Sequence, residues 1–303
     1  MSVDGNKAST MASIRERKGR ITNAIFEAIA IIEDSRVNKL GTGNFAKDVW
    51  EMAILPSLLN NAEVWDVLDR DVQQELESLQ TLFFRSLLAV PKTVPKPAIC
   101  YEGNLLQMKL RTFSRLLTFM KHVFHQSDSI LSKQVLTEQL KNDWQGLSKY
   151  AIKIQEILGI SGVFDMNVTK AQFKKQVKEA CKRVNDEELK QRISEYKKMK
   201  ALNDEIMKGN EYFFNQSLQN VRTLFRFRVE LFPAKLNFKH NSEFKQEKYL
   251  CDSCQTQSDE NTHVLYCESY KALREGLDVN NDSHLAWYLK QVMEIRTELR
   301  LNR

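Results

Sequence analysis

Residues 105–124 read LLQMKLRTFSRLLTFMKHVF, and the spacing of their apolar side chains decides the fold class. These side chains recur at intervals of three and four residues; they are Leu106, Leu110, Phe113, Leu117, Met120 and Phe124. That spacing places them on one face of an α-helix. We expect this helix to be the spine of the first of two helical units.

The same spacing predicts helices on the N-terminal side. Isoleucine and alanine recur at helical intervals over residues 14–32, and Gly-Thr-Gly-Asn at residues 41–44 then interrupts the pattern. A second helix is expected to start near Phe45, with Asn44 as its cap, and to bend or end at Pro56, which lacks an amide hydrogen.

Further helices are expected at residues 69–90, 211–232 and 285–301, the second of these as one helix stopped by a proline, and residues 130–158 are expected to form one or two helices. Residues 169–208 differ, because their apolar positions lie far apart among lysines and glutamates. A helix with so little to bury is either a mobile, solvent-bridging element or a lysine-rich arm that awaits a partner.

Composition supports an all-α fold. The 303 residues include only 10 Gly and 5 Pro, fewer turn formers than a strand-rich fold needs, and 42% are hydrophobic. A chain of this length normally forms more than one packed unit. We therefore predict two helical units with a small C-terminal element, divided at residues 1–126, 127–210 and 211–303.

The positive charge is concentrated in one region. The formal net charge is +6, and residues 170–248 hold 19 Lys and Arg against 11 Asp and Glu. Such a region favours binding to polyanions such as nucleic acid, although a solvated lysine-rich face is the common alternative. The polar first ten residues and the lack of a long apolar run predict an intracellular protein, nuclear or cytoplasmic, without disulfides or a membrane span.

Three cysteines and one histidine near the C-terminus have the spacing of metal ligands. Cys251 and Cys254 flank a two-residue turn, and His263 and Cys267 lie one helical turn apart. Three thiolates and an imidazole suit tetrahedral Zn²⁺, and a closed set of four ligands leaves no position for a substrate. The sequence predicts one structural zinc ion; the alternative, a chance cluster, is disfavoured because cysteine is rare. Cys100 and Cys181 are expected to be plain buried thiols.

Three arginines precede this motif on the helix predicted at residues 211–232. Arg222 and Arg226 lie one turn apart on its flank, whereas Arg228 falls inside its apolar arc. For Arg228, a buried stem with its guanidinium paired to a carboxylate and a contact with a phosphate remain equal alternatives. Arg222, Arg226 and Arg228 are our candidate nucleic-acid-binding residues.

No catalytic motif is found. The sequence contains no Gly-x-x-x-x-Gly-Lys loop, no Gly-x-Ser-x-Gly elbow, no His-Glu-x-x-His and no adjacent pair of aspartates. We therefore expect neither an enzyme nor a small-molecule substrate.

Three segments together resemble a known family. They are residues 55–65, with LPSLL and EVW, residues 84–91, with FR and LAVP, and residues 222–228, with the arginines, followed by the four metal ligands. In this combination the chain resembles the C-terminal part of reverse transcriptases of non-long-terminal-repeat retrotransposons, over residues 15–125 and 218–270. In that family a helical thumb follows the palm, and a cysteine/histidine zinc knuckle follows an arginine-bearing helix.

The resemblance implies a thumb-like domain at residues 1–126 and a nucleic-acid-handling function. The family's polymerase centre uses metal-binding aspartates on palm strands, including an adjacent pair, which this sequence lacks. The expected function is non-catalytic binding of RNA or DNA backbone by a fragment, a truncation or a reused domain of such an enzyme. The alternatives are a helical protein-interaction module with a purely structural knuckle, and polymerase activity with a separately encoded palm.

Overall fold

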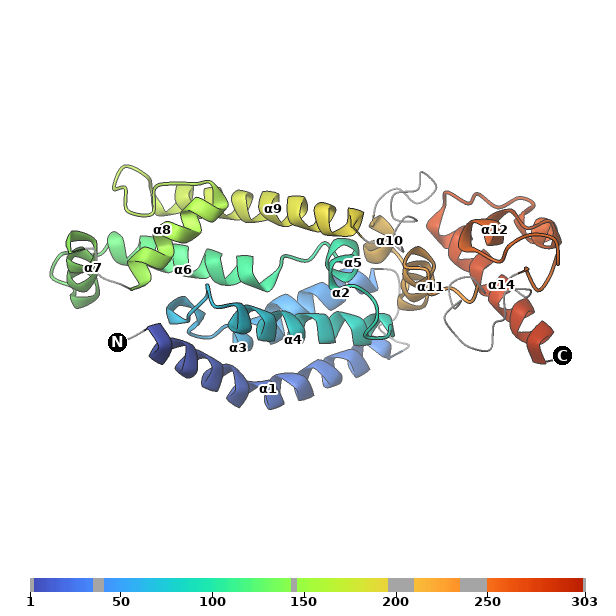
Figure 1. Cartoon of the computed structure of the whole chain (residues 1–303), viewed down its shortest axis with the longest axis horizontal. Helices are drawn as coiled ribbons and strands as arrows, with labels where there is room; N and C mark the ends of the chain where they lie inside the picture. The colour runs from blue at the N-terminus through green and yellow to red at the C-terminus, as the bar shows by residue number, and fades with distance from the viewer. Residues whose placement is uncertain (1–2, 35–40, 143–145, 196–209, 235–249, 302–303) are drawn as a thin grey trace. The chain divides into compact units, whose positions relative to one another are not determined.

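Helices of the predicted class build the whole described structure. The computed structural model describes residues 3–34, 41–142, 146–195, 210–234 and 250–301, and these residues form no β-strand. The prediction of an all-α fold is therefore confirmed (Figure 1). Within the described ranges, no helix combines the length and apolarity needed to cross a membrane.

Two compact units are present, and each is assembled from segments that are not consecutive. Unit 1 comprises Met1–Ala28, Val49–Phe84 and Asn104–Gln191, and unit 2 comprises the remaining segments, which include Arg192–Arg303. This division differs from the predicted ranges 1–126, 127–210 and 211–303, because segments far apart in the sequence pack together. All five cysteines are free thiols, and Cys100 and Cys181 are buried as expected.

The α-helices of the described residues are named in chain order. Before residue 143 the helices are α1 (Val3–Glu33), α2 (Thr42–Val49), α3 (Leu55–Leu58), α4 (Arg70–Leu88), α5 (Lys96–Glu102), α6 (Met108–Phe124) and α7 (Leu131–Lys141). After it they are α8 (Leu147–Leu158), α9 (Lys170–Ser194), α10 (Glu211–Asn215), α11 (Leu218–Arg228), α12 (Asn261–Tyr266), α13 (Lys271–Arg274) and α14 (Asp282–Leu301). Short 3-10 turns occupy Ala62–Val64 and Glu268–Tyr270.

The central helix α6 confirms the predicted apolar face but starts later than expected. Residues 105–107 remain outside the helix, and the Glu77 side chain accepts a hydrogen bond of 2.8 Å from the Met108 amide. A carboxylate at this position satisfies one of the unpaired amides at the helix N-terminus and opposes its partial positive charge. A cluster of Trp50, Phe83 and Phe84 forms another part of the core of unit 1, with ring centroids 4.9 to 6.1 Å apart.

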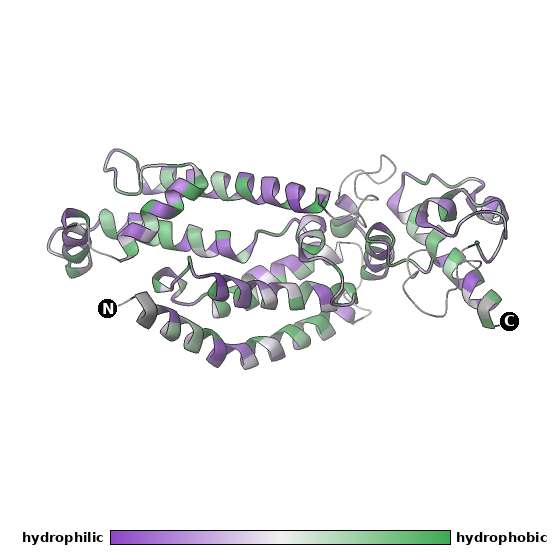
Figure 2. Ribbon diagram, viewed as in Figure 1, coloured by the Kyte–Doolittle hydropathy of each residue, from purple (hydrophilic) through white to green (hydrophobic). Residues whose placement is uncertain are grey.

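Helix α9 is packed over its described length, so the expectation of a segment with little to bury is wrong. Phe173, Val177 and Cys181 are buried, and the Cys181 thiol donates to the Leu110 carbonyl of α6. Asn185 is also buried and bonds residues 105 and 107 just before α6. The sparse apolar positions suffice because polar side chains complete the contact, and Figure 2 shows hydrophilic and hydrophobic residues mixed around this helix. Residues 196–208 of the predicted segment lie outside the described residues.

The second predicted helix differs from the expectation at its start, near Gly43, and at Pro56. The helix begins at Thr42 and not near Phe45, so Asn44 lies in its first turn and is not its cap. Gly43 lies where an added Cβ would be 1.8 Å from the Phe213 carbonyl oxygen, which requires a residue without a side chain. The missing amide of Pro56 is accommodated by a π-helical turn at Trp50–Ile54, and the helix continues to Leu58.

The helix predicted at residues 211–232 is two helices. Helix α10 ends at Asn215, and Ser217 caps α11 by accepting a hydrogen bond from the Asn220 amide. Helix α11 then ends before Pro233, because Glu230 adopts a left-handed conformation with φ of 56° and the Leu231 amide bonds back to the Arg226 carbonyl at 2.8 Å.

We predict that Asn185→Ala lowers the free energy of unfolding by about 1–3 kcal/mol, because it leaves the Leu105 carbonyl and the Gln107 amide without their buried partner. Urea denaturation measures the change. Gln176→Ala, on an exposed position of the same helix, is the control and should stay within about 0.5 kcal/mol of wild type. Equal stability of both variants would show that α9 is not packed as described.

Candidate metal centre

The first two candidate ligands lie on a tightly turned loop. The Cys251 amide donates to the Gln257 carbonyl at 2.9 Å, and the Gln255 amide donates to the Cys251 carbonyl at 3.0 Å. Gln255 adopts a left-handed conformation with φ of 57°, and Leu250 and Ser258 form an antiparallel bridge at the base of the loop. These bonds fold the chain so that Cys251 and Cys254 face the same side.

The other two ligands come from α12 and its end. His263 lies on α12, whereas Cys267 is the residue that leaves the helix, with φ of −58° and ψ of 125°. Because the φ of Cys267 is still helical, its side chain keeps the position one turn after His263, and only the chain that follows Cys267 changes direction.

The four side chains form one cluster. Cys251, His263 and Cys267 are buried and Cys254 is half-buried, and the four ligand atoms lie within 4.8 Å of one another. The Cys251 and Cys267 sulfurs are 3.9 Å apart, and the Cys254 sulfur is 3.4 Å from His263 Nε2. Tetrahedral bonds of zinc length would separate two sulfurs by about 3.8 Å and a sulfur and a nitrogen by about 3.5 Å. The cluster can therefore bind a metal ion with small movements.

A hydrogen bond fixes the orientation of the histidine ring. His263 Nδ1 lies 2.7 Å from the Gln257 side-chain oxygen, which can only accept a hydrogen bond. An N–H at Nδ1 can donate to this oxygen, and Nε2 then presents its lone pair to the Cys254 sulfur. This arrangement is typical of metal-binding histidines, whose second nitrogen donates to a neighbouring oxygen.

The surroundings of Cys254 and Cys267 shift the pKa values of these two thiols in opposite directions. Burial alone would raise the pKa of Cys254, but hydrogen bonds from the Thr256 hydroxyl and from the amides of Thr256 and Gln257 outweigh it and lower that pKa to about 6. Burial, reinforced by the Cys251 sulfur, raises the pKa of Cys267 to about 11. The amides thus favour a thiolate at Cys254, the form that binds metal.

A buried ion pair supports the cluster from α14. Arg296 and Asp259 are 1% and 0% exposed, and their closest nitrogen and oxygen are 2.6 Å apart. The same guanidinium lies 3.8 Å from the Cys251 sulfur and donates to the Tyr270 hydroxyl and the Pro233 carbonyl. Burial opposes the charge of Arg296, but Asp259 more than compensates and raises its pKa. One side chain thereby connects α14, the ligand loop and the chain after α11.

Two further contacts attach the cluster to neighbouring helices. The Tyr288 hydroxyl of α14 donates to the Val264 carbonyl at 2.5 Å, and the Asn261 side chain donates to the Phe227 carbonyl of α11 at 2.6 Å. Helix α14 also packs along α11, with Lys290 donating to the Asn220 side-chain oxygen. The cluster is therefore built into unit 2 and is not a separate appendage.

The three candidate arginines all have internal partners. Arg222 donates to the Leu87 carbonyl at 2.7 Å and pairs with Glu33, and Arg226 donates to the Ala89 carbonyl at 2.6 Å. Both bonds satisfy carbonyls at the end of α4.

Arg228 follows the first of its two alternatives. It is 1% exposed, and its guanidinium lies 3.0 Å from the fully buried Glu102 and over the ring of Tyr212. Burial raises the pKa of Glu102, while Arg228 opposes that shift. In this structure Arg228 is a core residue and does not reach a surface where a phosphate could bind.

Three residues of the centre were not predicted from the sequence: Gln257, Asp259 and Arg296. A signal for Arg296 was present, because it continues the apolar stripe of α14 set by Leu285, Leu289 and Val292. A charged residue in such a stripe indicates a buried partner. Comparisons with protein-family models, curated proteins and solved structures found no match.

We predict that Arg296→Met lowers the free energy of unfolding by about 3–5 kcal/mol, because it leaves the Asp259 carboxylate buried without a counter-ion. Replacing both residues, as Arg296→Met with Asp259→Leu, should recover most of this loss. Chemical denaturation measures both variants, with Glu298→Gln on the exposed side of α14 as the control. A double variant as unstable as the single one would show that the pair is not coupled.

Proposed function

We propose that this chain is a non-catalytic nucleic-acid-binding protein that contacts RNA or DNA backbone. We also propose that a structural zinc ion stabilises its C-terminal region. The proposed relatives are the C-terminal parts of non-long-terminal-repeat retrotransposon reverse transcriptases. The observation that carries the binding function is a row of lysines on α9. Lys170, Lys174, Lys178 and Lys182 recur every four residues and are all exposed.

The row has the geometry and charge for phosphates. Lysines four apart on a helix are separated by about 6 Å along its axis. Residues 170–183 contain six Lys and Arg against one Glu, whereas residues 184–194 contain two against three acidic residues. The basic half includes the N-terminus of α9, where cations are unfavourable without an anion nearby. The buried stripe of the helix holds these lysines in place, and a fixed basic surface attracts polyanions.

The donor set at the C-terminal region supports zinc. Three cysteine sulfurs and one imidazole are the ligands of structural zinc sites, and their observed separations are close to tetrahedral. A closed set of four protein ligands leaves no open position, so the ion would stabilise the fold without taking part in a reaction. The ligand loop buries little apolar surface of its own, which is the condition under which metal binding supplies folding free energy.

We predict one zinc ion per chain in protein purified under reducing conditions, measured by elemental analysis. Cys254→Ser should lose the metal because only three ligands remain, while Cys181→Ser, a buried thiol outside the cluster, should retain it. Chelation should lower the melting temperature of the wild type. Metal content near zero together with a melt that chelation does not alter would refute the zinc proposal.

We predict that Lys174→Ala with Lys178→Ala reduces the slope of log affinity against log salt by about 1.4 to 1.8 units. The reason is that binding releases about 0.7 to 0.9 fewer counterions from the nucleic acid for each phosphate contact that is lost. Fluorescence anisotropy of labelled oligonucleotides over a salt series measures the slope. Lys190→Ala with Arg192→Ala, in the acidic half of the same helix, is the control and should keep the wild-type slope.

A second comparison separates the lysines from the arginines. Arg222→Ala with Arg226→Ala should lower the melting temperature, because carbonyls at the end of α4 lose their donors, but should keep the salt slope. A reduced slope in this variant, with an unchanged slope in the lysine variant, would assign phosphate binding to the arginines instead.

One observation favours the protein-interaction function as a second candidate. Ile130, Leu131 and Val135, at the start of α7, are 45%, 73% and 47% exposed, which leaves an apolar surface on unit 1. If the wild-type protein binds neither RNA nor DNA at low salt, this candidate replaces nucleic-acid binding.

A further inference from the structure

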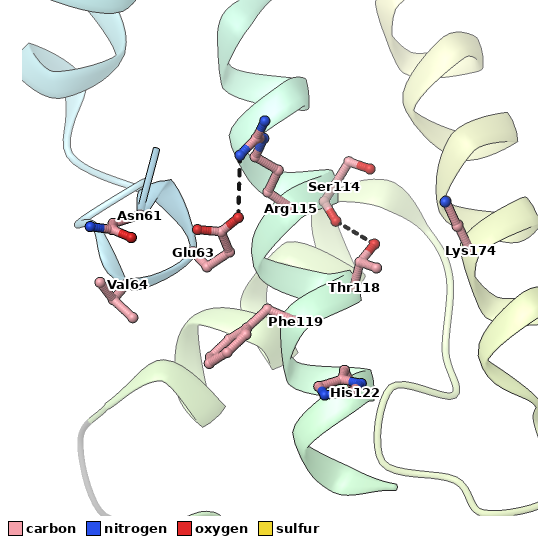
Figure 3. Close-up of a pocket in the computed structure, with 9 residues that line it drawn as sticks. All are labelled: Asn61, Glu63, Val64, Ser114, Arg115, Thr118, Phe119, His122 and Lys174. Carbon is pink, nitrogen blue, oxygen red and sulfur yellow. Dashed lines mark hydrogen bonds and ion pairs between the residues drawn. The ribbon is translucent and has the colours of Figure 1, made fainter. Parts of the chain in front are cut away.

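A cleft of about 680 Å³ lies on unit 1 between α6, the turn at Ala62–Val64 and α9 (Figure 3). Its lining combines cationic, polar and apolar side chains from these three elements. They are Asn61, Glu63, Val64, Ser114, Arg115, Thr118, Phe119, His122 and Lys174. The volume is within the range of sites that hold small organic groups.

One side of the cleft is basic. Lys174 belongs to the lysine row of α9, and Lys170 of the same row lies 3.4 Å from His122 Nδ1. Glu63 is the one carboxylate among the nine described lining residues, and Arg115 pairs with it at 3.3 Å. The positive charge on this side of the cleft comes from Lys174 and the neighbouring Lys170, which favours an anion such as a phosphate.

The other side offers apolar surface. Val64 is 47% exposed and Phe119 is half-buried, and Figure 3 shows the Phe119 ring on α6 directed away from Lys174. Aromatic rings next to a basic surface bind unpaired bases by stacking, with little dependence on base identity. A base within a duplex is covered by its neighbours and cannot make this contact.

Hydrogen-bonding groups lie between these two sides. The Thr118 hydroxyl donates to the Ser114 carbonyl at 2.7 Å, which directs its proton away and leaves its oxygen as an acceptor. Asn61 adopts a left-handed conformation with φ of 62°, and its side chain contributes both a donor and an acceptor to the lining. The cleft thus carries groups for an anion, for an aromatic face and for polar edges.

We propose that this cleft holds an unpaired nucleotide of single-stranded RNA or DNA, with its base against Phe119 and Val64 and its phosphate at Lys174 and His122. The inference rests on the proposed function and specifies it, because the lysine row alone would bind single strands and duplexes alike. The combination of aromatic and cationic groups in one cleft selects the single strand.

The test measures the binding of three labelled probes by the full chain: a 15-nucleotide oligo(U), the matching oligo(dT) and a 15-base-pair DNA duplex. We expect Phe119→Ala to weaken binding of both single strands by about 5- to 150-fold, the effect of losing one stacked base, while leaving duplex binding and the salt slope unchanged. Phe119→Tyr should retain wild-type affinity. Phe26→Ala is the matched control, because Phe26 is an exposed phenylalanine on α1, outside the lining of the cleft.

The outcomes distinguish the inference from the function on which it rests. No binding of any probe by the wild type at low salt would overturn the proposed function. Wild-type binding that Phe119→Ala leaves unchanged, or weakens equally for single strands and duplex, would overturn the cleft alone. If Phe119→Ala weakens binding of only one of the two single strands, the cleft is assigned to that nucleic acid. A melting temperature of Phe119→Ala equal to that of the wild type shows that the weaker binding does not come from unfolding.

Discussion

Hydrogen bonds from cationic side chains to backbone carbonyls at the ends of helices are the interaction on which the structure depends. A chain of many short helices has many ends, and the last carbonyls of each lack an internal donor. Here Arg222 and Arg226 serve the end of α4, Arg183 donates to the Leu158 carbonyl at the end of α8, and Lys133 donates to the Phe124 carbonyl at the end of α6. Each bond joins two helices, and the positive charge of the side chain interacts favourably with the partial negative charge at the C-terminal end of a helix. The positive charge of the chain is thus partly a structural requirement of an all-helical fold.

This requirement explains why a count of basic residues overstates the surface available to polyanions. Of the basic residues at 170–248, the three arginines of α11 are engaged within unit 2, and Arg228 is buried against Glu102. The lysines of α9 differ, because the row from Lys170 to Lys182 projects from a helix whose other positions supply the packing. Position on a packed element, and not the number of charges, decides which cations can meet phosphates. Arg222 and Arg226 already donate to carbonyls near the end of α4, which leaves them fewer N–H groups for phosphates.

The sequence predicted the helical class and the metal-ligand cluster, because both depend on local spacing. Periodicity places Leu110 and Leu117 on one face whatever the rest of the chain does, and the ligand set is defined by residue types at short separations. What could not be predicted depends on distant residues. The close approach of Gly43 depends on Phe213, 170 positions away. The π-helical turn before Pro56 and the break at Gln216 are features of backbone geometry that carry no composition signal. The role of Asn185 was likewise hidden, because its partners are the carbonyl and amide of residues 105 and 107.

The charge balance of the candidate metal centre links it to the position of α14. A divalent ion bound by three thiolates and a neutral imidazole would carry a net charge of −1, and the Arg296 guanidinium, 3.8 Å from the Cys251 sulfur, opposes that charge. Without a metal ion in the cluster, the Asp259 carboxylate would still balance the charge of the Arg296 guanidinium. The ion pair is therefore compatible with both the metal-bound and the metal-free cluster. The arginine is therefore held by Asp259 and directed at the ligands, and it belongs to the helix that packs along α11. A bound metal ion would therefore stabilise the docking of α14, and the docked helix would favour the bound ion.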